Sequence, residues 1–335
     1  MDLKQAPCVV GRVKLKPSEA LRFLAGVAVA VLVLGFVVLR VTSCAPPPRP
    51  ASPLARPATS PPRAPPLAAG PVAPPTPPPA LSAAICANGP AAAARANSAS
   101  LLTLIWSPFG RTETGWATYA PLVAREIQTA CAPETPGFAL ALAQWAQARR
   151  IAGDGVFSDG VFAPLKTAIE LRRPFVQISA KRICPDPPPA NALASATAAE
   201  GYGGKPIQLR AGALTAYRQM AAAARREDPA IAADPRNLTL FSGFRGPADD
   251  AGRCAREHNC NGMVRATCSA HRTGLAMDLY VGQAPGFGPD SSTDPNRAFM
   301  SRTPAYHWLV ANADRFGFVP YPFEPWHWEW TGEAP

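Results

Sequence analysis

Hydrophobic residues recur at helical spacing in the middle of the chain. Two stripes place apolar side chains three or four positions apart: Phe138, Leu142 and Trp145, then Phe162, Leu165 and Ile169. A turn at residues 153–157 separates the stripes, and the proline-rich run at 185–189 marks a boundary after them. Because this spacing lines one face of a helix, the pattern predicts a mainly helical region over residues 81–200.

Strands join the helices in the C-terminal part of the chain. Helical spacing covers residues 209–226 and 303–315, and short strands are expected at 237–241, 276–281 and 326–330. In the last of these, three tryptophans alternate with His327 and Glu329, which is typical of a half-buried strand. Strands that mix with helices without a regular alternation favour an α+β domain over residues 201–335.

One long apolar segment lies near the N-terminus. Residues 23–39 are an uninterrupted apolar run of 17 residues between Arg22 and Arg40. A helix of this length spans roughly 26 Å, and the flanking arginines can reach the edges of a hydrocarbon core about 30 Å thick. Basic residues before the run favour a cytoplasmic tail at residues 1–22, one transmembrane helix at 23–40 and an exported body.

Two alternatives stay open for this segment. A cleaved secretory signal has the same basic start and apolar centre. Residues 41–44 resemble a bacterial lipobox, so Cys44 is also a candidate for lipidation. All of these alternatives export the body, and the expected location is the inner membrane, with the domain on its periplasmic side.

Proline dominates the segment that follows. Of the 36 residues at 45–80, 16 are proline, so residues 41–80 are expected to be a linker that buries no core. As an extended polyproline-type chain it would reach up to about 110 Å. Such a tether suits a target that stands off the membrane, such as the cell wall, although a passive solvated linker would have the same composition.

The positive charge is concentrated in this N-terminal arm. Residues 1–80 carry nine basic and two acidic side chains, whereas 81–200 carry ten and eight, and 201–335 carry fourteen and thirteen. The arm therefore accounts for +7 of the formal net charge of +10. A nearly neutral folded part lacks the basic surface that nucleic acid requires, so no nucleic-acid partner is expected.

The part expected to be exported contains six cysteines: Cys86, Cys131, Cys184, Cys254, Cys260 and Cys268. An even number in an oxidising compartment predicts up to three disulfides, whose pairing the sequence does not select. The alternative is a structural zinc cluster made of Cys254, His258, Cys260 and Cys268. This spacing matches no common zinc finger, and export favours the disulfides.

Two motifs in the C-terminal domain carry candidate chemistry. His271 and Asp278 are seven residues apart with Gly274 between them, which predicts a turn that leads into a strand. The tryptophan-rich strand presents His327 on the face opposite its indoles. Two imidazoles and one carboxylate from separate strands form a three-ligand set for Zn²⁺ that leaves the fourth position to water.

Glu324 is the candidate base beside this site. Glu324 is two residues before Trp326, so on a straight strand its side chain would point to the same face as the indoles and away from His327. Pro325 is expected to bend the chain and bring the carboxylate to the same site. There it can take a proton from the zinc-activated water and later pass the proton to the leaving amine.

The two motifs in this order resemble those of a known family. Ser-x-His-x-x-Gly-x-Ala-x-Asp at 269–278, followed by Glu-x-Trp-His at 324–327, resembles the VanY-type zinc D,D-carboxypeptidases, which have a hedgehog/DD-peptidase-like fold. The resemblance covers roughly residues 201–332. It implies the following zinc ligands: His271, Asp278 and His327. It also makes Glu324 the catalytic base.

Two further residues are candidates for substrate binding. An upstream Ser-Gly-Phe-Arg matches the family's Ser-Gly-Tyr/Phe-Arg, and the resemblance implies that Arg245 contacts the substrate. Ser269 is interpreted as a hydrogen-bonding residue for the substrate or the loop, because no Ser-x-x-Lys arrangement makes it a nucleophile.

Residues 253–268 depart from the family pattern and are interpreted as an insertion. Glu329 shares the strand face of His327 and either orients a ligand or is solvated.

The middle region has a shorter resemblance. Asp-Gly-Val-Phe at 154–157, between two helices, resembles small helical peptidoglycan-binding modules. The alternative is a helical packing subdomain without a ligand.

Together these features predict a membrane-tethered zinc D-alanyl-D-alanine carboxypeptidase that acts on peptidoglycan stem peptides. Two alternatives remain. A peptidoglycan endopeptidase would use the same metal and base, and a non-catalytic cell-wall-binding anchor would use the metal for structure alone.

Overall fold

The computed structural model describes residues 83–181, 184–257 and 268–335. The predicted cytoplasmic tail, transmembrane helix and linker, together with the candidate lipidation site Cys44, lie outside the described residues, at 1–80. Among the helices of the described ranges, none is both long and apolar enough to span a membrane.

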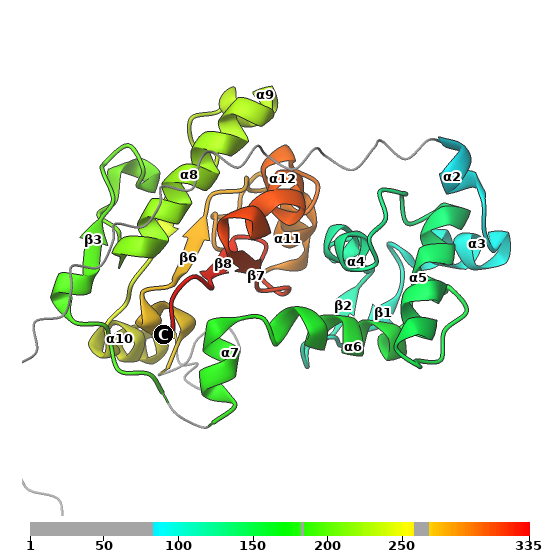
Figure 1. The fold of residues 1–335 in the computed structure, drawn as a ribbon, viewed down its shortest axis with the longest axis horizontal. Coiled ribbons are helices and arrows are strands. Elements are labelled where there is room, and N and C mark those ends of the chain that lie inside the picture. The colour runs from blue at the N-terminus through cyan, green and yellow to red at the C-terminus, as the bar shows by residue number, and fades with distance from the viewer. Residues whose placement is uncertain (1–82, 182–183, 258–267) are drawn as a thin grey trace, which may run out of the picture. The chain divides into compact units, whose positions relative to one another are not determined.

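A helical region forms the N-terminal part of the described chain (Figure 1). Its helices are α2 (Ala83–Ala87), α3 (Ala91–Ser100), α4 (Ala120–Glu126), α5 (Pro136–Ala148), α6 (Asp159–Glu170) and α7 (Pro174–Ser179). A two-stranded antiparallel sheet lies between α3 and α4 and consists of β1 (Ile105–Trp106) and β2 (Glu113–Thr114). Both predicted hydrophobic stripes are buried, one on α5 and one on α6, which confirms the two helices expected there.

Local sequence explains where α5 begins. Thr135 caps the helix, because its Oγ1 accepts a hydrogen bond of 3.3 Å from the backbone N–H of Phe138. Pro136 occupies the first turn, where a missing N–H costs little. The buried face of α5 joins an aromatic core in which the rings of Trp116 and Phe157 stack 4.1 Å apart.

The C-terminal part of the described chain mixes helices with strands, as expected for an α+β domain. Its helices are α8 (Ala211–Glu227), α9 (Pro229–Ala232), α10 (Pro247–Glu257), α11 (Asp294–Met300) and α12 (Pro304–Asn312). Short 3-10 helices connect these elements: η1 (Ala190–Ala192), η2 (Tyr202–Gly204), η3 (Ala270–Thr273) and η4 (Ala313–Phe316). α8 confirms the helix expected at 209–226, and α12 with η4 confirms the one expected at 303–315, whereas α9, α10 and α11 were not predicted.

A four-stranded antiparallel sheet forms the centre of this domain. In spatial order its strands are β5 (Leu240–Ser242), β6 (Ala276–Leu279), β8 (His327–Trp330) and β7 (Phe318–Pro320). A separate antiparallel pair consists of β3 (Leu193–Ser195) and β4 (Gln208–Arg210). β4 runs directly into α8 and so belongs to the C-terminal domain. Its partner β3 therefore belongs to the same domain, although β3 lies before the expected boundary at residue 201.

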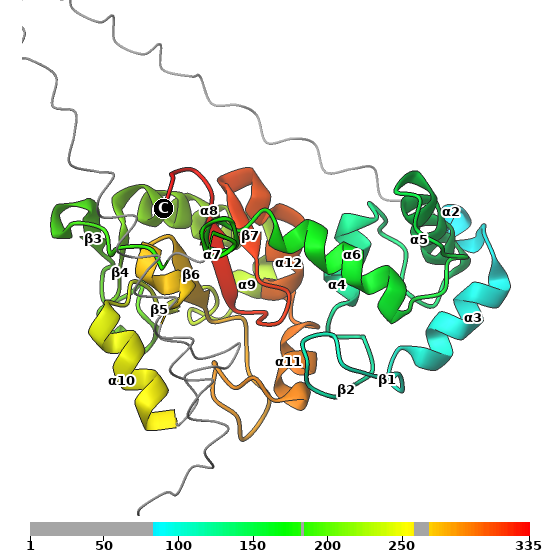
Figure 2. The ribbon, with the colours of Figure 1, turned by 90° about the horizontal axis from the view of Figure 1, so that it is seen from below.

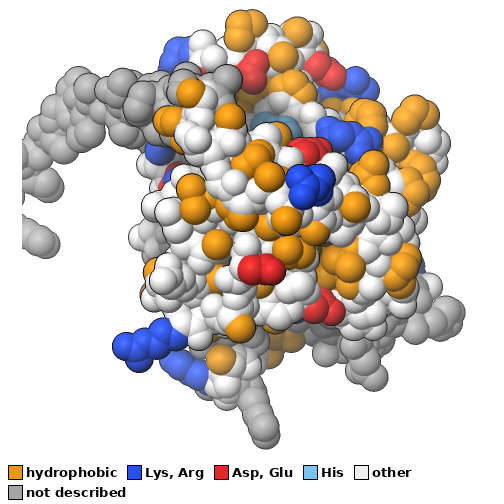
Figure 3. Space-filling view, turned by 90° about the vertical axis from the view of Figure 1, so that its right-hand side faces the viewer, with side chains coloured by type: hydrophobic (Ala, Val, Ile, Leu, Met, Phe, Trp, Pro, Cys, Tyr) orange, Lys and Arg blue, Asp and Glu red, His pale blue; other side chains and the backbone are white. Residues whose placement is uncertain are grey.

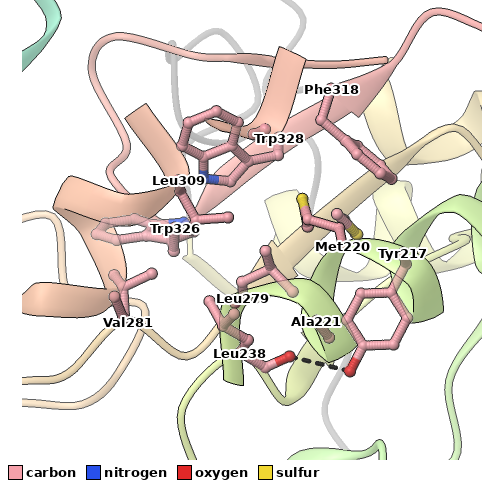
Figure 4. Close-up of a cluster of buried hydrophobic side chains, with 14 of the residues drawn as sticks. Tyr217, Met220, Ala221, Leu238, Leu279, Val281, Leu309, Phe318, Trp326 and Trp328 are labelled. Atoms are coloured by element: carbon pink, nitrogen blue, oxygen red, sulfur yellow. Dashed lines mark hydrogen bonds between the residues drawn. The ribbon is translucent and has the colours of Figure 1, made fainter. Parts of the chain in front are cut away.

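One face of the four-stranded sheet packs into the main hydrophobic core. Met277 of β6 lies opposite Trp328 of β8, and both side chains share this core with residues from α8 and α12. Figure 4 shows Trp328 with Leu309 above Met220, and the hydroxyl of Tyr217 donating to the carbonyl of Leu238. The alternate residues of β6 and β8 therefore point to the other face of the sheet.

The other face of β8 is also buried, which the alternating pattern did not predict. His327 and Glu329 are only 3% and 1% exposed. α7 packs against β8 (Figures 1 and 2). Arg173, directly before α7, donates a hydrogen bond to Glu329, while the rings of His271 and Tyr321 lie against His327. A strand that looks half-buried from its sequence is thus covered by a helix about 150 residues earlier in the chain.

Two disulfides are formed within the described residues. Cys86 is bonded to Cys131, and Cys184 is bonded to Cys268. Cys254 is disulfide-bonded as well. The alternative zinc cluster needs thiolates at Cys254 and Cys268, so these disulfides remove two of its four ligands, while Cys260 and His258 lie outside the described residues.

The surface of the helical region carries mixed side chains. On the face shown in Figure 3, basic and acidic groups are interspersed among hydrophobic ones. The exposed large hydrophobic residues of this region are Ile85, Leu102, Ile105, Leu140 and Leu171. This distribution matches the small net charge counted for residues 81–200.

Candidate metal centre and active site

Three predicted metal ligands converge on the face of the sheet opposite the main hydrophobic core. They are His271 on η3, Asp278 on β6 and His327 on β8. One ligand atom from each lies within 4.8 Å of the others, and all three side chains are buried. The structure therefore brings together side chains that are up to 56 residues apart in the sequence.

The backbone around the first motif explains this convergence. Gly274 ends η3 in the left-handed region, at φ +71°, which a residue with a side chain rarely adopts. The chain reverses there and enters β6, as the sequence predicted. Asp278 of β6 then lies directly opposite His327 of β8 in the antiparallel ladder, so their side chains emerge on the same face.

Hydrogen bonds fix the orientation of His271. Its Nδ1 lies 2.7 Å from the carbonyl oxygen of Gly243, and its Nε2 lies 3.3 Å from Oδ2 of Asp278. With the proton on Nδ1, the ring donates to this carbonyl and turns the lone pair of Nε2 toward the cluster. Gly243 itself packs closely against β4, since a Cβ at this position would come within 2.5 Å of the carbonyl oxygen of Gln208.

His327 is oriented in the opposite sense. Its Nδ1 lies 2.9 Å from Oδ1 of Asp278, whereas its Nε2 faces Oε1 of Glu329 at the longer distance of 3.5 Å. Each imidazole thus presents one nitrogen to the cluster and directs the other at an oxygen of the protein. This arrangement is typical of histidines that bind a metal.

The charges of the cluster shift the pKa values of its members. Burial and the nearby Arg245 guanidinium lower the pKa of His271 to about 4. Burial also acts to lower the pKa of His327, but Asp278 and Glu329 outweigh this effect and raise the pKa to about 9. Burial acts to raise the pKa of Asp278, yet the two imidazoles hold it well below its usual range. The cluster therefore favours positive charge next to Asp278.

The donor set fits a divalent metal ion. Three carboxylates of the described residues face the ring of His327, those of Asp278 at 2.9 Å, Glu329 at 3.5 Å and Glu324 at 3.9 Å. Arg173 balances the charge of Glu329, which leaves two negative charges beside two imidazoles. Two nitrogen donors and one carboxylate oxygen form a ligand set suited to Zn²⁺.

Glu324 lies at this site because the chain turns before β8. The backbone N–H of Glu324 donates to the carbonyl of Tyr321 at 3.1 Å, and the N–H of His327 donates to the carbonyl of Glu324 at 2.9 Å. This turn places Oε2 of Glu324 3.9 Å from Nδ1 of His327. The bend predicted at Pro325 is therefore present, and the candidate base is on the same side as the ligands.

Arg245 and Ser269 meet at Asp250, a residue that the sequence analysis missed. Ser269 donates from Oγ to Oδ1 of Asp250 at 2.8 Å, and Nε of Arg245 lies 3.4 Å from the same oxygen. Arg245 also donates to Oγ of Ser242, which pairs with Asp278 across the sheet. The two predicted substrate-binding residues thus lie in one network beside the ligands.

A pattern in α10 was available to find Asp250. Asp250 and Cys254 are four residues apart and both are 2% exposed, which marks the buried face of a helix. The interpretation of residues 253–268 as an insertion concealed this spacing, because α10 continues to Glu257.

Arg173 is the second residue that the sequence analysis missed. Its Nε donates to Oε1 of Glu329 at 2.7 Å, across 156 positions of sequence, and both side chains are buried. Glu329 is therefore held by the helical region and is not solvated.

An α+β domain in which a buried His-Asp-His cluster adjoins a carboxylate has the features of a metal-dependent hydrolase. Residues 206–333 match the family model of VanY, described as D-alanyl-D-alanine carboxypeptidase. This match supports the VanY-type carboxypeptidase domain that the two motifs predicted for this part of the chain. No curated protein matches the chain.

Proposed function

We propose that this protein is a zinc-dependent D-alanyl-D-alanine carboxypeptidase that acts on peptidoglycan stem peptides. The observation that carries the proposal is the convergence of His271, Asp278 and His327 within the matched domain, with Glu324 beside them. A site that only stabilised the fold would have no need of this additional carboxylate.

The two imidazoles and Asp278 would hold the zinc ion. When bound, zinc supplies Lewis acidity, which lowers the pKa of water and polarises a peptide carbonyl. Glu324 is the residue that accepts a proton from the attacking water and returns it to the leaving amine. Its position on a turn, held by backbone hydrogen bonds on both sides, keeps its carboxylate next to the ligands.

Arg245 supports exopeptidase action. A guanidinium can bind the free carboxylate of a terminal D-alanine, and Asp250 and Ser242 hold this one beside His271. Ser269 shares Asp250 and so contributes to the same wall of the site. An endopeptidase substrate would present no terminal carboxylate to Arg245 at the point of cleavage.

The location of the enzyme is proposed from the sequence. The apolar run at 23–39 would anchor it in the inner membrane, and the proline-rich residues 41–80 would carry the domain toward the wall on the periplasmic side.

The proposal is tested by digestion of defined wall fragments. Full-length protein in mild detergent is supplied with zinc and pentapeptide-containing muropeptides, and the products are identified by mass spectrometry. Loss of a single terminal D-alanine, stopped by a chelator and restored by zinc, is the expected result. Internal cuts would support the endopeptidase, and zinc binding without cleavage of any fragment would support the wall-binding anchor.

A further inference from the structure

The helical region contacts the active-site segment through a buried ion pair. Arg173, which directly precedes α7, places Nε 2.7 Å and Nη2 2.6 Å from Oε1 of Glu329. The other oxygen of Glu329 accepts a hydrogen bond of 2.9 Å from the backbone N–H of Phe175. Both carboxylate oxygens of this strand residue are thus held by the start of α7, which lies beside β8 (Figures 1 and 2).

This ion pair continues to a metal ligand. Oε1 of Glu329 faces Nε2 of His327 at 3.5 Å, while Nδ1 of the same ring faces the cluster. A carboxylate on the far nitrogen of a metal-binding histidine sets the orientation of the ring and its donor strength. Arg173 is therefore joined to the candidate metal centre through a single intervening side chain.

A second connection reaches the other end of the same segment. Arg297 on α11 is fully buried and donates from Nε to the carbonyl of Phe323, next to Glu324, at 2.8 Å. Its Nη2 donates to the hydroxyl of Tyr119 at 2.5 Å, and its Nη1 lies 3.1 Å from Glu113. Because Tyr119 and Glu113 belong to the helical region, that region also holds the residue before the candidate base.

Stability alone does not account for these contacts. Burying charges removes them from water, so a buried ion pair often stabilises a fold no better than apolar side chains of the same volume. Both connections end on residues 323–329, which carry Glu324 and His327. Orientation of the active-site segment explains why charged groups occupy these positions.

We propose that the helical region is a structural part of the catalytic unit that positions residues 323–329 from both ends. Arg173 acts through Glu329 on His327, and Tyr119 acts through Arg297 on the turn that carries Glu324. Arg173 and Tyr119 are thus positioning residues. This role rests on the proposed function, because it takes His327 as a metal ligand and Glu324 as the base.

The first test measures zinc affinity, which does not depend on knowing the substrate. Zinc is titrated against a chromogenic chelator in full-length protein, and circular dichroism reports the folded fraction. Arg173→Ala should bind zinc about 10- to 100-fold more weakly. The matched control is Arg125→Ala, because Arg125 also links the helical region to the C-terminal domain, through Asp314 on η4, and is expected to stay within about twofold of wild type.

Arg173→Lys provides the test if the alanine variant does not fold. It keeps the positive charge but cannot place two N–H groups on Glu329, so a smaller loss of zinc affinity is expected. Folded Arg173→Ala protein with wild-type zinc affinity would overturn the proposal, and so would wild-type affinity of Arg173→Lys if the alanine variant does not fold. A wild-type protein that binds zinc but cleaves nothing would instead refute the proposed function and leave this comparison decisive.

The second test asks whether Tyr119 affects catalysis through Glu324 without affecting zinc binding. Tyr119→Phe should lower kcat while KM and zinc affinity stay near wild type, because only the turn that carries Glu324 loses support. Tyr217→Phe is the matched control, since its buried hydroxyl donates to Leu238 in the core, away from the site. Equal kcat values for the two folded variants would show that Tyr119 is a packing residue only.

Discussion

Asp278 and His327 are direct cross-strand partners in β6 and β8, and this register brings Oδ1 of the carboxylate within 2.9 Å of Nδ1 of the imidazole. A slip of one residue would turn one of the two side chains into the hydrophobic core. Met277 and Trp328, which are also partners, hold the register from the core side. The pairing of the sheet and the chemistry of the site are therefore set by the same contacts.

Replacing Asp278 should remove the metal from a folded protein. In Asp278→Asn the amide brings no negative charge to the two imidazoles, so zinc retained after dialysis should fall to a small fraction of the wild-type amount. Elemental analysis per mole of protein measures this. Asp314→Asn, at an exposed carboxylate paired with Arg125, is the control and should keep its zinc. Full occupancy in Asp278→Asn would exclude it as a ligand.

Glu324→Gln should separate metal binding from turnover. The amide occupies the same volume but cannot accept a proton, so kcat should fall by about 10²- to 10⁴-fold while zinc content is unchanged. Steady-state release of D-alanine gives kcat, and elemental analysis gives zinc. A variant with wild-type kcat would show that another group takes the proton. Glu227→Gln, on a surface pair with Arg315, provides the comparison.

Substitution of Arg245 should reduce the enzyme's preference for peptides with a free C-terminal carboxylate over peptides with an amidated C-terminus. If its guanidinium binds the terminal carboxylate, wild type prefers the free acid to the amidated peptide. Arg245→Ala should then lose roughly 10- to 100-fold in kcat/KM on the free acid and little on the amide. Competition between the two peptides measures the ratio, and an unchanged preference would place the carboxylate elsewhere.

The Cys86–Cys131 disulfide should stabilise the helical region. It closes a loop across 45 residues, for which the loss of chain entropy predicts at most about 4 kcal/mol. Urea unfolding of a Cys86→Ala, Cys131→Ala double variant should show a lower midpoint than wild type. Reductant breaks the other disulfides in both proteins, so the difference between the two midpoints should disappear in reductant if it belongs to this disulfide. Equal midpoints for oxidised wild type and variant would contradict the prediction.

Glu200 should make part of the stability dependent on pH. Hydrogen bonds from Arg218 lower the pKa of Glu200 to about 2, below its value in the unfolded chain. The contribution is therefore complete above a pH of about 4.5 and disappears as pH falls toward 2. Glu200→Gln should cost about 1 kcal/mol at pH 7 and much less at pH 2.5. Urea midpoints at the two pH values measure this, and an equal loss at both would contradict the ion pair.

The helices and the convergence of the candidate ligands could be predicted because their signals are local. The stripes on α5 and α6 repeat within a dozen residues, and α8 and α12 show the same spacing. His271, Asp278 and His327 lie in two short motifs whose residue types match one chemistry. Glu324 followed from the bend that Pro325 imposes.

The supports of the site could not be predicted, because pairing between distant side chains leaves no local pattern. Arg173 lies before a short helix, 156 positions from Glu329, and nothing near it in the sequence marks its partner. The same holds for Arg297, which meets Tyr119 across 178 positions. Burial of Glu329 on the second face of β8 depends on Arg173 and the start of α7, and it leaves no trace in the alternation of the strand itself.

The Cys184–Cys268 bond has a consequence for proteolysis. Any single backbone cut between these two residues yields an N-terminal fragment that includes Arg173 and a C-terminal fragment that includes His271. The sulfur bridge keeps both fragments attached, so a nicked molecule would run as one species on a non-reducing gel and separate only after treatment with a thiol. Intact mobility in such a gel would thus not prove an intact polypeptide.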